Sequence, residues 1–399
     1  MINKQYTWDD LGVSAEMSLF VPNHIADPTD NGCEECHAMF HVEPRGELFD
    51  GQLSRLCWAL HRVSGLADMQ GMKPVFRRFF LSDATNQLAA LRAHRSDGSV
   101  TDAFSACTCA TSFIQQPPLD GSKLALWIYF QKGSSLSAVD DVVVAEHNGY
   151  RHLYKWGMTS PAGDSYSQTQ SLLDDYESVL SHFGGATIEA NCIRTWFFVR
   201  DVDTQYAGMV RARRENFIAQ GLTPQTHYVS STGIGGVPAD PQAIVQFDTY
   251  AVTGFAPQQQ RYLYAPTHLN PTYQYGVTFE RGTVFEYGDR AEIYISGTAS
   301  INNKGEVLHV GDIVRQTERM WENVATLLAE GNASFSDVAQ IIVYLRDMAD
   351  YPVVYRMFDE RFPGIPRVIT LAPVCRPTWL IEMECIAIPH RQNDGYRSF

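Results

Sequence analysis

The chain carries one α/β pattern three times, and this repeat limits what it can fold into. In each copy, apolar residues at helical spacing are followed by a glycine and then by a β-branched and aromatic run that ends at an aspartate. Each copy also holds a glutamine 31 positions before its aspartate: Gln52 and Asp83, Gln170 and Asp201, Gln316 and Asp347. Equal separation in three places indicates an internal repeat and a body assembled from three similar units.

Each copy predicts the order β-β-α-β-α-β, which is a sheet with two helices on one face. Glycines end the first helix of each copy, as helix C-termini prefer. In "RAEIYISGTASINNKGEV" the turn residues "NNKG" join an expected strand pair. The free faces of three such sheets can bury one another, so we expect an α/β (α+β) fold packed as an intrachain pseudo-trimer. The expected units are residues 1–145, 146–265 and 266–399.

Composition places the 399-residue chain among acidic globular proteins. Hydrophobic residues make up 45% and charged residues 19%, and the formal net charge is −14. Such a protein repels nucleic acid and anionic lipid in general. No apolar run approaches the roughly 18–20 residues that span a bilayer, and the N-terminus has no apolar region typical of a signal peptide. We therefore expect a cytoplasmic protein with no nucleic-acid partner, no membrane segment and no cofactor.

The C-terminal segment "RVITLAPVCRPTWLIEMECIAI" contains charges where buried strands are expected. Arg367 opens it, and Glu382 and Glu384 lie within its second apolar run. Desolvation disfavours such charges unless they have partners or a function. The matching positions of the second unit are Ser231 and Gln246, and the first unit offers no acid in "ALWIYF". The third unit alone is therefore expected to keep a charged pair.

The third unit resembles the Rid superfamily, also called the YjgF or perchloric-acid-soluble endoribonuclease family. The resemblance covers roughly residues 279–390 and rests on "YISGTASINNKGEV", on the helix-and-strand segment from "QTERMW" to "DERFP", and on "PRVITLAPVCRPTWLIEMECIAI". Family members form homotrimers with a site at each interface, so a chain with three copies is expected to be a monomer or a weak homo-oligomer. The layout is also similar to that of the chorismatases, long chains with Rid-like domains and a comparable last strand.

The resemblance assigns roles to five residues. It implies that Arg367 holds a substrate carboxylate, that Glu382 handles the water or proton, and that Gly297 ends the "SG" strand. Tyr355 stands where many Rid deaminases have asparagine, which departs from the family pattern. Cys375 stands where some chorismatases carry a cysteine that influences the product, and a small buried apolar residue is the alternative.

Strand alternation points Glu384 the same way as Glu382. Two interpretations of Glu384 stay open, a second polar group of the site and a partner for Arg376.

An arginine that binds a carboxylate and a glutamate with a raised pKa suit a small substrate with an sp² carbon next to its carboxylate. We expect a Rid-type hydrolase that deaminates an imine or enamine. The alternative is a chorismatase, which cleaves chorismate to pyruvate and a hydroxybenzoate or a dihydroxycyclohexadiene carboxylate. A hypothesis of another class is a non-catalytic ligand-binding or RNA-cleaving regulator, and the acidic charge argues against RNA.

Three further motifs carry weaker signals. "CEECH" provides a possible zinc set, but four ligands within nine residues differ from the usual spacing, and we expect no metal. "RARRENF" at 211–217 is interpreted as a solvated helix face, with contact to a second substrate carboxylate as the alternative. "STGIGG" at 231–236 lacks the dinucleotide spacing and is interpreted as a turn, with a place beside an interface cleft as the alternative. The four possible zinc ligands in and just after "CEECH" are Cys33, Cys36, His37 and His41.

Overall fold

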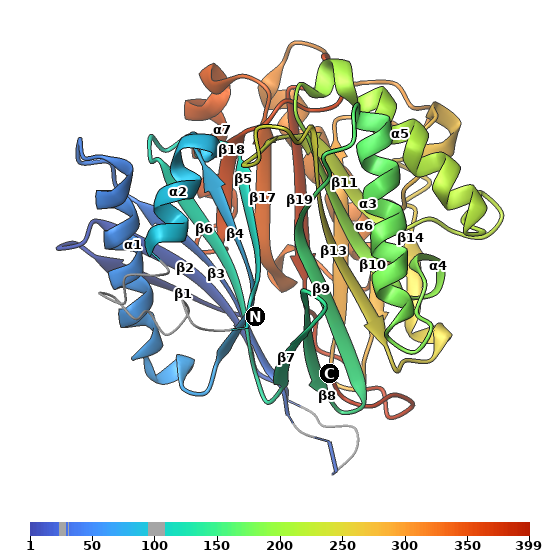
Figure 1. The fold of residues 1–399 in the computed structure, drawn as a ribbon, viewed down its shortest axis with the longest axis horizontal. Helices are drawn as coiled ribbons and strands as arrows, with labels where there is room; N and C mark the ends of the chain where they lie inside the picture. Colours follow the sequence, from blue (N-terminus) through green and yellow to red (C-terminus); the bar gives the residue numbers. More distant parts are fainter. Residues whose placement is uncertain (24–28, 31, 95–107) are drawn as a thin grey trace.

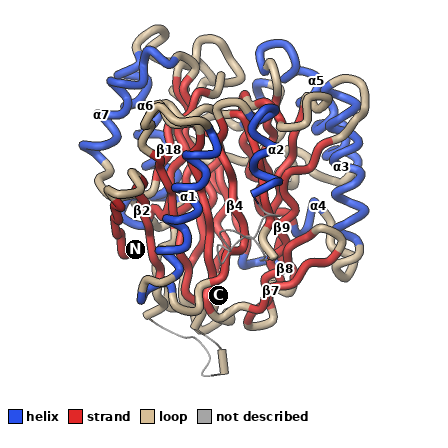
Figure 2. The backbone as a smooth tube through the Cα atoms, turned by 60° about the vertical axis from the view of Figure 1, so that its left-hand side comes forward, coloured by secondary structure: helices blue, strands red, loops and turns tan. Residues whose placement is uncertain are grey.

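The computed structural model describes residues 1–23, 29–30, 32–94 and 108–399, and it contains three β-sheets with helices on their outer sides (Figure 1). Figure 2 shows the strands gathered in the middle of the molecule and the helices around them. This arrangement confirms the α+β fold of three repeated units.

The first sheet has the strand order β1-β2-β3-β6-β4-β5-β12. Helices α1 (Phe49–Ser64) and α2 (Ala84–His94) belong to this unit, with a 3-10 turn at Ala67–Met69. The strands are β1 (Ile2–Trp8), β2 (Val13–Phe20), β3 (Glu34–Val42), β4 (Lys73–Leu81), β5 (Ala110–Gln115), β6 (Leu124–Lys132) and β12 (Val237–Pro238).

The second sheet has the order β11-β10-β13-β9-β8-β7. Its helices are α3 (Ser165–Ser181), the short α4 (Ile188–Asn191) and α5 (Val202–Ala219). The strands are β7 (Ser135–Val139), β8 (Val142–His147), β9 (Tyr150–Thr159), β10 (Cys192–Val199), β11 (Ser230–Gly235) and β13 (Val245–Thr253).

The third sheet has the order β14-β15-β16-β19-β17-β18. Its helices are α6 (Ile313–Glu330) and α7 (Tyr351–Arg361), with 3-10 turns at Pro257–Gln259, Thr272–Tyr275, Phe335–Asp337 and Met348–Asp350. The strands are β14 (Gln260–Leu263), β15 (Gly282–Glu286), β16 (Ala291–Ala299), β17 (Val338–Leu345), β18 (Arg367–Leu371) and β19 (Ile381–Ala387).

The same pairing recurs in all three sheets. A central strand (β4, β10 or β17) has a parallel neighbour on one side (β5, β11 or β18) and the antiparallel last strand of its unit (β6, β13 or β19) on the other. Between units, β5 packs beside β9, β11 beside β16, and β17 beside β3. These contacts run from the first unit to the second, to the third, and back to the first. The units therefore close into an intrachain pseudo-trimer.

The inner faces of the three sheets share one core, while each helix layer covers the outer face of its own sheet. Phe76, Trp127, Trp156, Trp196 and Tyr250, which come from the first two units, are all buried in the shared core together with residues of the third. Aromatic side chains bury a large area each, and their rings contact one another here, as Phe76 and Trp156 do in a tilted pair with a centroid distance of 4.2 Å. This core fixes the three units against one another and so determines the shape of the clefts between them.

The repeated glutamine attaches the start of a helix to the last strand of the same unit. Gln52 and Gln316 accept backbone N–H groups next to β6 and β19, at 2.7 and 2.9 Å. In the second unit Gln168 does this, because its Oε1 accepts two N–H groups next to β13 at 2.7 and 3.0 Å. Equal spacing predicted Gln170 as the matching glutamine of the second unit, and this prediction is therefore wrong by two positions. The second unit holds two more residues between its glutamine and Asp201 than the other units hold.

The expected strand pair around "NNKG" is also wrong in part. β16 pairs with β15, which precedes it, and Ile301 and Val307 on either side of the turn form an isolated antiparallel bridge. The amide of Asn323 on α6 donates to the carbonyls of Ala299 and Ile301, each at 3.0 Å. Side-chain donors thus satisfy the backbone after β16, and the chain leaves the sheet there.

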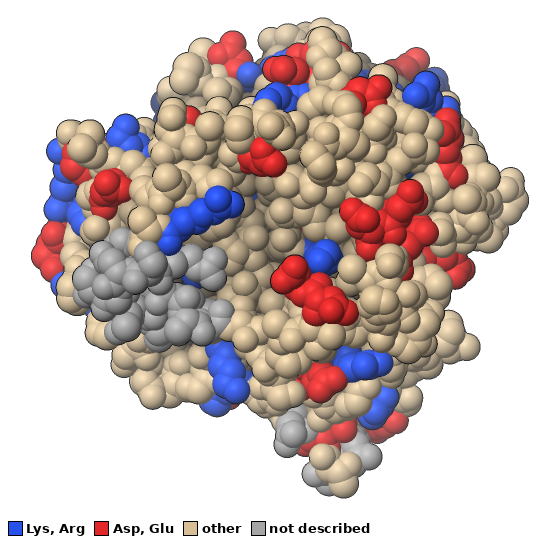
Figure 3. Space-filling view, viewed as in Figure 1, with Lys and Arg blue, Asp and Glu red and all other residues tan. Residues whose placement is uncertain are grey.

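The surface agrees with the acidic composition. On the face drawn in Figure 3, lysines and arginines lie in separate small groups among acidic side chains. Within the described ranges, no helix combines the length and the apolar character needed to cross a membrane. The location of the protein in the cell, its oligomeric state and its indifference to nucleic acid stay predictions.

Candidate active site

A cavity of about 340 Å³ lies between the second and third units. Helix α5 and strand β11 of the second unit form one side. Strands β16 and β19 and the loop 372–380 of the third unit form the other, and residues 275–281 complete the lining. The two sides are held together because Ser231 N donates to Ser296 Oγ and Gly297 N donates to Thr232 Oγ1, both at 2.9 Å. "STGIGG" therefore begins as strand β11 beside an interface cleft, which was the less favoured of its two interpretations.

Glu382 lies in this cavity on β19, and its side chain is buried. Gly297, on the neighbouring strand β16, leaves the room for it, because a Cβ at position 297 would collide with Oε1 of Glu382. Burial, together with the negative charge of Glu384, raises the pKa of Glu382 to about 8. At neutral pH this carboxylic acid keeps its proton and can donate it.

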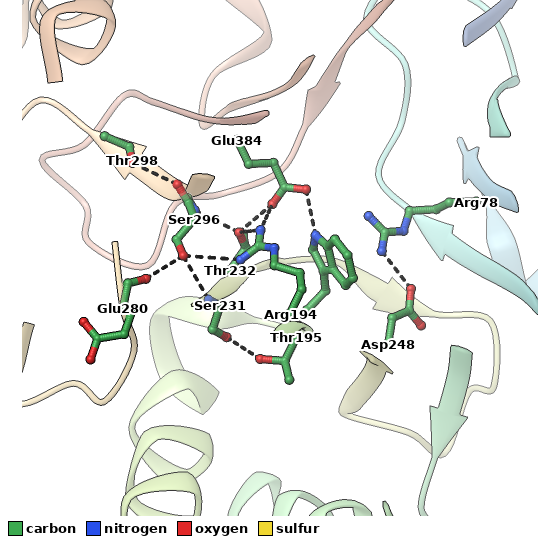
Figure 4. Close-up of polar contacts among 12 residues, drawn as sticks. Arg78, Arg194, Thr195, Ser231, Thr232, Asp248, Glu280, Ser296, Thr298 and Glu384 are labelled. Atoms are coloured by element: carbon green, nitrogen blue, oxygen red, sulfur yellow. Dashed lines mark hydrogen bonds and ion pairs between the residues drawn. The ribbon is translucent and has the colours of Figure 1, made fainter. Parts of the chain in front are cut away.

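Glu384 has a structural role at the same interface (Figure 4). Its carboxylate accepts from Arg194 Nη2 at 2.8 Å and from Trp196 Nε1 at 2.7 Å, and Thr232 also donates to it. The salt bridge joins β19 of the third unit to β10 of the second, and both charges are almost fully buried. Neither open interpretation of Glu384 holds, because it is outside the cavity lining and its partner is Arg194 rather than Arg376.

Two buried guanidinium groups line the cavity with donors left over. Arg213 on α5 donates to Ser231 Oγ at 3.2 Å and to Thr278 Oγ1 at 3.3 Å and also interacts with the Tyr206 hydroxyl, while its Nη2 has no partner of normal hydrogen-bond geometry among the described residues. Arg281 donates to the carbonyl of Asn270 at 2.9 Å, and its Nε is likewise unpartnered there. These bonds go to neutral oxygens, and a buried cation without an anionic partner is unfavourable. The site is therefore suited to an anionic ligand.

Arg376, Tyr206 and Cys375 also line the cavity. The Arg376 guanidinium lies over the rings of Tyr275 and Trp379, with centroid distances of 4.7 and 4.9 Å. Cys375 and the hydroxyl of Tyr206 hydrogen-bond to one another. Burial, together with the nearby Glu382, raises the pKa of the Cys375 thiol to about 12, so the sulfur stays neutral and is not a thiolate nucleophile.

Arg367 and Tyr355 line a different cavity, of about 230 Å³, between the third and first units. The Arg367 guanidinium contacts Asp359 Oδ1 at 2.6 Å and donates to the carbonyl of Phe362 at 3.0 Å, while its backbone N–H donates to Glu16 Oε2 at 3.0 Å. Tyr355 is 43% exposed on α7. The expected pair of Arg367 and Glu382 is therefore not formed, and the arginine that was expected to hold substrate already has partners.

Sheet geometry explains the separation. Arg367 pairs with Ile341 of β17, and Glu382 pairs with Tyr344 of the same strand, three positions away. An odd offset along a strand places the two side chains on opposite faces of the sheet. In the second unit the register position of Arg367 is occupied by Ser231, as expected. The cavity of Glu382 thus combines the arginine position of the second unit, Ser231, with the glutamate position of the third.

The favoured interpretation of "RARRENF", a solvated helix face, is wrong for Arg213, and the alternative, contact with a substrate carboxylate, stays a prediction. Arg211 is exposed, as a solvated face requires, but Arg213 is buried in the site. The available signal was helical spacing, because Arg213 lies three residues after Val210 and four before Phe217, and both of these are buried. Arg281 carries no comparable signal in the sequence.

The residues of "CEECH" and the nearby His41 are buried or form hydrogen bonds within the protein. Cys33 and Cys36 are buried thiols, and His37 Nδ1 accepts from Trp127 Nε1 at 3.2 Å. His41 Nδ1 contacts Asp120 at 3.2 Å, in the cavity of Arg367. Among the described residues, no group of three or more histidine, cysteine, aspartate or glutamate side chains could hold a metal ion.

Comparison with known proteins finds relatives of the third unit and of the whole fold. The endoribonuclease L-PSP family matches residues 288–389. The 3-aminoacrylate deaminase RutC of Acinetobacter baylyi is 32% identical over 97 residues, which are 24% of this chain and 77% of that protein. The 3-hydroxybenzoate synthase of Streptomyces hygroscopicus is 24% identical over 275 residues, which are 62% of this chain and 77% of that protein.

A crystal structure of a chorismatase has the same fold over most of the chain. It superposes with a TM-score of 0.61 at 18% identity and covers 81% of this chain and 96% of its own. The family match falls on the unit that supplies Glu382, Gly297 and Cys375, while the fold likeness extends over all three units. The chain belongs to the endoribonuclease L-PSP family, which is the Rid superfamily that the third unit resembles.

Proposed function

We propose that the protein is a chorismatase-type enzyme, which cleaves the enolpyruvyl ether of chorismate and releases pyruvate. One observation carries the proposal. Glu382, a carboxylic acid with a pKa of about 8, shares a cavity with two buried arginines whose donors are not all used. The cavity contains a proton donor and an anion-binding wall, and these are the two things that the reaction requires.

The substrate fits the charges of the site. Chorismate carries one carboxylate on its ring and a second on the enolpyruvyl side chain. Arg213 and Arg281 provide a guanidinium for each, and Arg376 adds a third beside the aromatic rings of Tyr275 and Trp379. A volume of about 340 Å³ lies in the ordinary range for small-molecule sites.

The reaction begins with proton transfer from Glu382 to the terminal methylene carbon of the enol ether. The adjacent carbon becomes an oxocarbenium ion, water adds to it, and the resulting proton returns to the carboxylate. The hemiketal then breaks its bond to the ring oxygen, which takes the hydroxyl proton, and pyruvate leaves. The ring remains as a dihydroxycyclohexadiene carboxylate, and loss of water from it would give a hydroxybenzoate.

Deamination of a small enamine or imine is the second candidate. The match of the third unit to the 3-aminoacrylate deaminase RutC favours it, and Glu382 would again protonate a carbon or assist water. It ranks behind chorismate cleavage, which reverses the sequence-based preference. The reason is that the family arginine, Arg367, contacts Asp359 in another cavity, while the cavity of Glu382 provides several guanidinium groups rather than one.

Incubation of the purified protein with chorismate tests the proposal. Pyruvate is measured with a coupled lactate dehydrogenase assay, the ring products are separated by chromatography, and Glu382→Gln serves as the control protein. A parallel reaction with freshly generated 2-iminopropionate measures ammonia. Pyruvate release that depends on Glu382 supports the proposal, whereas ammonia release without pyruvate would replace it by the deaminase.

A further inference from the structure

One side chain, Arg346, joins two parts of the active-site cleft that belong to different units. It follows directly after β17, and its Nη1 and Nη2 donate to Asp203 Oδ2 and Oδ1 at 3.0 and 2.9 Å. Nη2 also donates to the carbonyl of Val374. Asp203 lies in the first turn of α5 and lines the cavity. Arg346 therefore contacts both walls of the cleft at once.

The wall on the third unit is the loop 372–380, which carries Cys375 and Arg376. Gln316 fixes the end of this loop, because its amide accepts from Leu380 N at 2.9 Å and donates to Thr378 O at 2.9 Å. At the other end of the loop, the backbone contact is with the second unit, where Gly235 N donates to the carbonyl of Pro373 at 2.9 Å. The bond from Arg346 to Val374 thus fixes the peptide group immediately before Cys375.

The wall on the second unit is α5. Tyr206 lies one turn after Asp203, and Arg213 lies on the same helix. Holding Asp203 therefore sets where Tyr206 and Arg213 stand relative to Cys375. A bidentate arginine–carboxylate contact fixes orientation as well as distance.

We propose that Arg346 is a positioning residue, and that its contacts with Asp203 and Val374 form a clasp that keeps the cleft closed around the substrate. The inference deepens the proposed function and rests on it. The Asp203 side chain is 48% exposed and that of Arg346 is 18% exposed, so the clasp can open without disturbing the core. An ion pair with one half-exposed partner contributes less to folding than a fully buried pair, and the Asp203 carboxylate can turn into solvent when the contact opens.

The rate at which Cys375 is alkylated reports opening without any substrate. Iodoacetamide labelling is followed by mass spectrometry of the peptide that contains Cys375. We expect Arg346→Gln to label about tenfold faster, the change that loss of a charge-assisted contact produces in an opening equilibrium. The matched control is Arg62→Gln, which removes a similar bidentate contact with Asp10 on the first unit. Cys375 of this variant should be labelled at the rate of the parent protein. Equal labelling of Arg346→Gln and the parent protein would overturn the clasp.

Kinetics on chorismate then separate positioning from folding. A clasp that opens lowers the fraction of binding-competent protein, so KM should rise about tenfold while kcat stays within about twofold, because bound substrate closes the cleft again. Arg346→Lys keeps the charge and should recover part of the loss. A merely structural residue would lower kcat through less folded enzyme and leave KM alone, and that outcome would overturn the proposal. Should chorismate not be a substrate, the labelling experiment still decides whether the clasp exists.

Discussion

Two clefts of the molecule are built from matching strands in matching register, yet their charges are arranged differently. Between the third and first units, Arg367 occupies the family arginine position and contacts Asp359, with Glu16 also close by. Between the second and third units, Ser231 occupies that position, and Arg213 reaches in from α5 with one nitrogen unpartnered among the described residues. In the first of these clefts the arginine is paired with protein carboxylates, and in the second the buried acid Glu382 lies near an arginine that comes from a helix.

In the cleft between the first and second units, the buried charges are paired with one another. Gln246 stands at the glutamate position and donates to Ser112 Oγ at 2.8 Å. Arg78 and Asp248 form a fully buried salt bridge at 2.9 Å, and the guanidinium lies over aromatic rings, including that of Trp156 at 4.8 Å. Charges paired in this way hold units together. The comparison teaches that the two clefts differ in the counter-ion, because Arg78 is paired with a carboxylate whereas the hydrogen bonds of Arg213 and Arg281 go to neutral oxygens.

Replacing Glu382 by glutamine should have the largest effect on catalysis. The change removes the proton donor but keeps the size, so kcat should fall by about 10²–10⁴ while substrate binding is nearly retained. Steady-state kinetics on chorismate and a binding titration with the inactive variant measure the two quantities. The matched control is Gln246→Glu, which puts an acid at the equivalent position of the packed cleft and should create no second activity. Full activity of Glu382→Gln would mean that the glutamate is structural.

Replacing Arg213 by glutamine should have the next largest effect. A hydrogen bond between charged groups contributes about 1.5–3 kcal/mol, so loss of this carboxylate contact should raise KM by about 10–10²-fold with a smaller change in kcat. The measurement is KM for chorismate at constant ionic strength, with Arg211→Gln on the exposed face of the same helix as the control. An unchanged KM would show that the unpartnered donor of Arg213 does not face the substrate.

The fold of the third unit could be predicted from sequence, but the partners of its charges could not. Helical and strand periodicity in one segment indicate its elements, and the family resemblance pointed to Glu382, Gly297 and Cys375, which meet in one cavity. Which arginine joins them depends on how neighbouring units pack and on which face of the sheet a side chain leaves. Arg367 and Glu382 are on one unit, but an odd register offset sends them to different clefts. Sequence spacing carries no information about that packing.

The pH dependence should follow the proton on Glu382. Its pKa of about 8 means that kcat/KM stays level below pH 8 and falls about tenfold per unit above it. Stability has a related dependence, because between about pH 4.5 and 8 the unfolded chain loses a proton that the folded chain keeps. The unfolded state binds fewer protons there, so the free energy of unfolding falls as pH rises through this window.

Measurement of kcat/KM and of chemical denaturation from pH 5 to 9 checks both statements. Glu382→Gln should remove this contribution and be more stable than the parent protein at pH 8. A rate that instead rises through pH 8 would show that ionised Glu382 is the active form, as a base that activates water would require.

Replacing Arg367 by glutamine should have the smallest effect on catalysis and a clear effect on stability. The variant leaves Glu16 buried without its cationic neighbour and frees Asp359 at the surface, so the free energy of unfolding should fall by about 2–3 kcal/mol. KM and kcat for chorismate should stay within about twofold, because the guanidinium lines the separate cavity between the third and first units. Arg367→Lys is the matched variant, since it keeps the charge and should recover part of the stability. If Arg367→Gln raised KM as strongly as Arg213→Gln, Arg367 would contact the substrate, and the assignment of substrate binding to the cleft of Glu382 alone would be wrong.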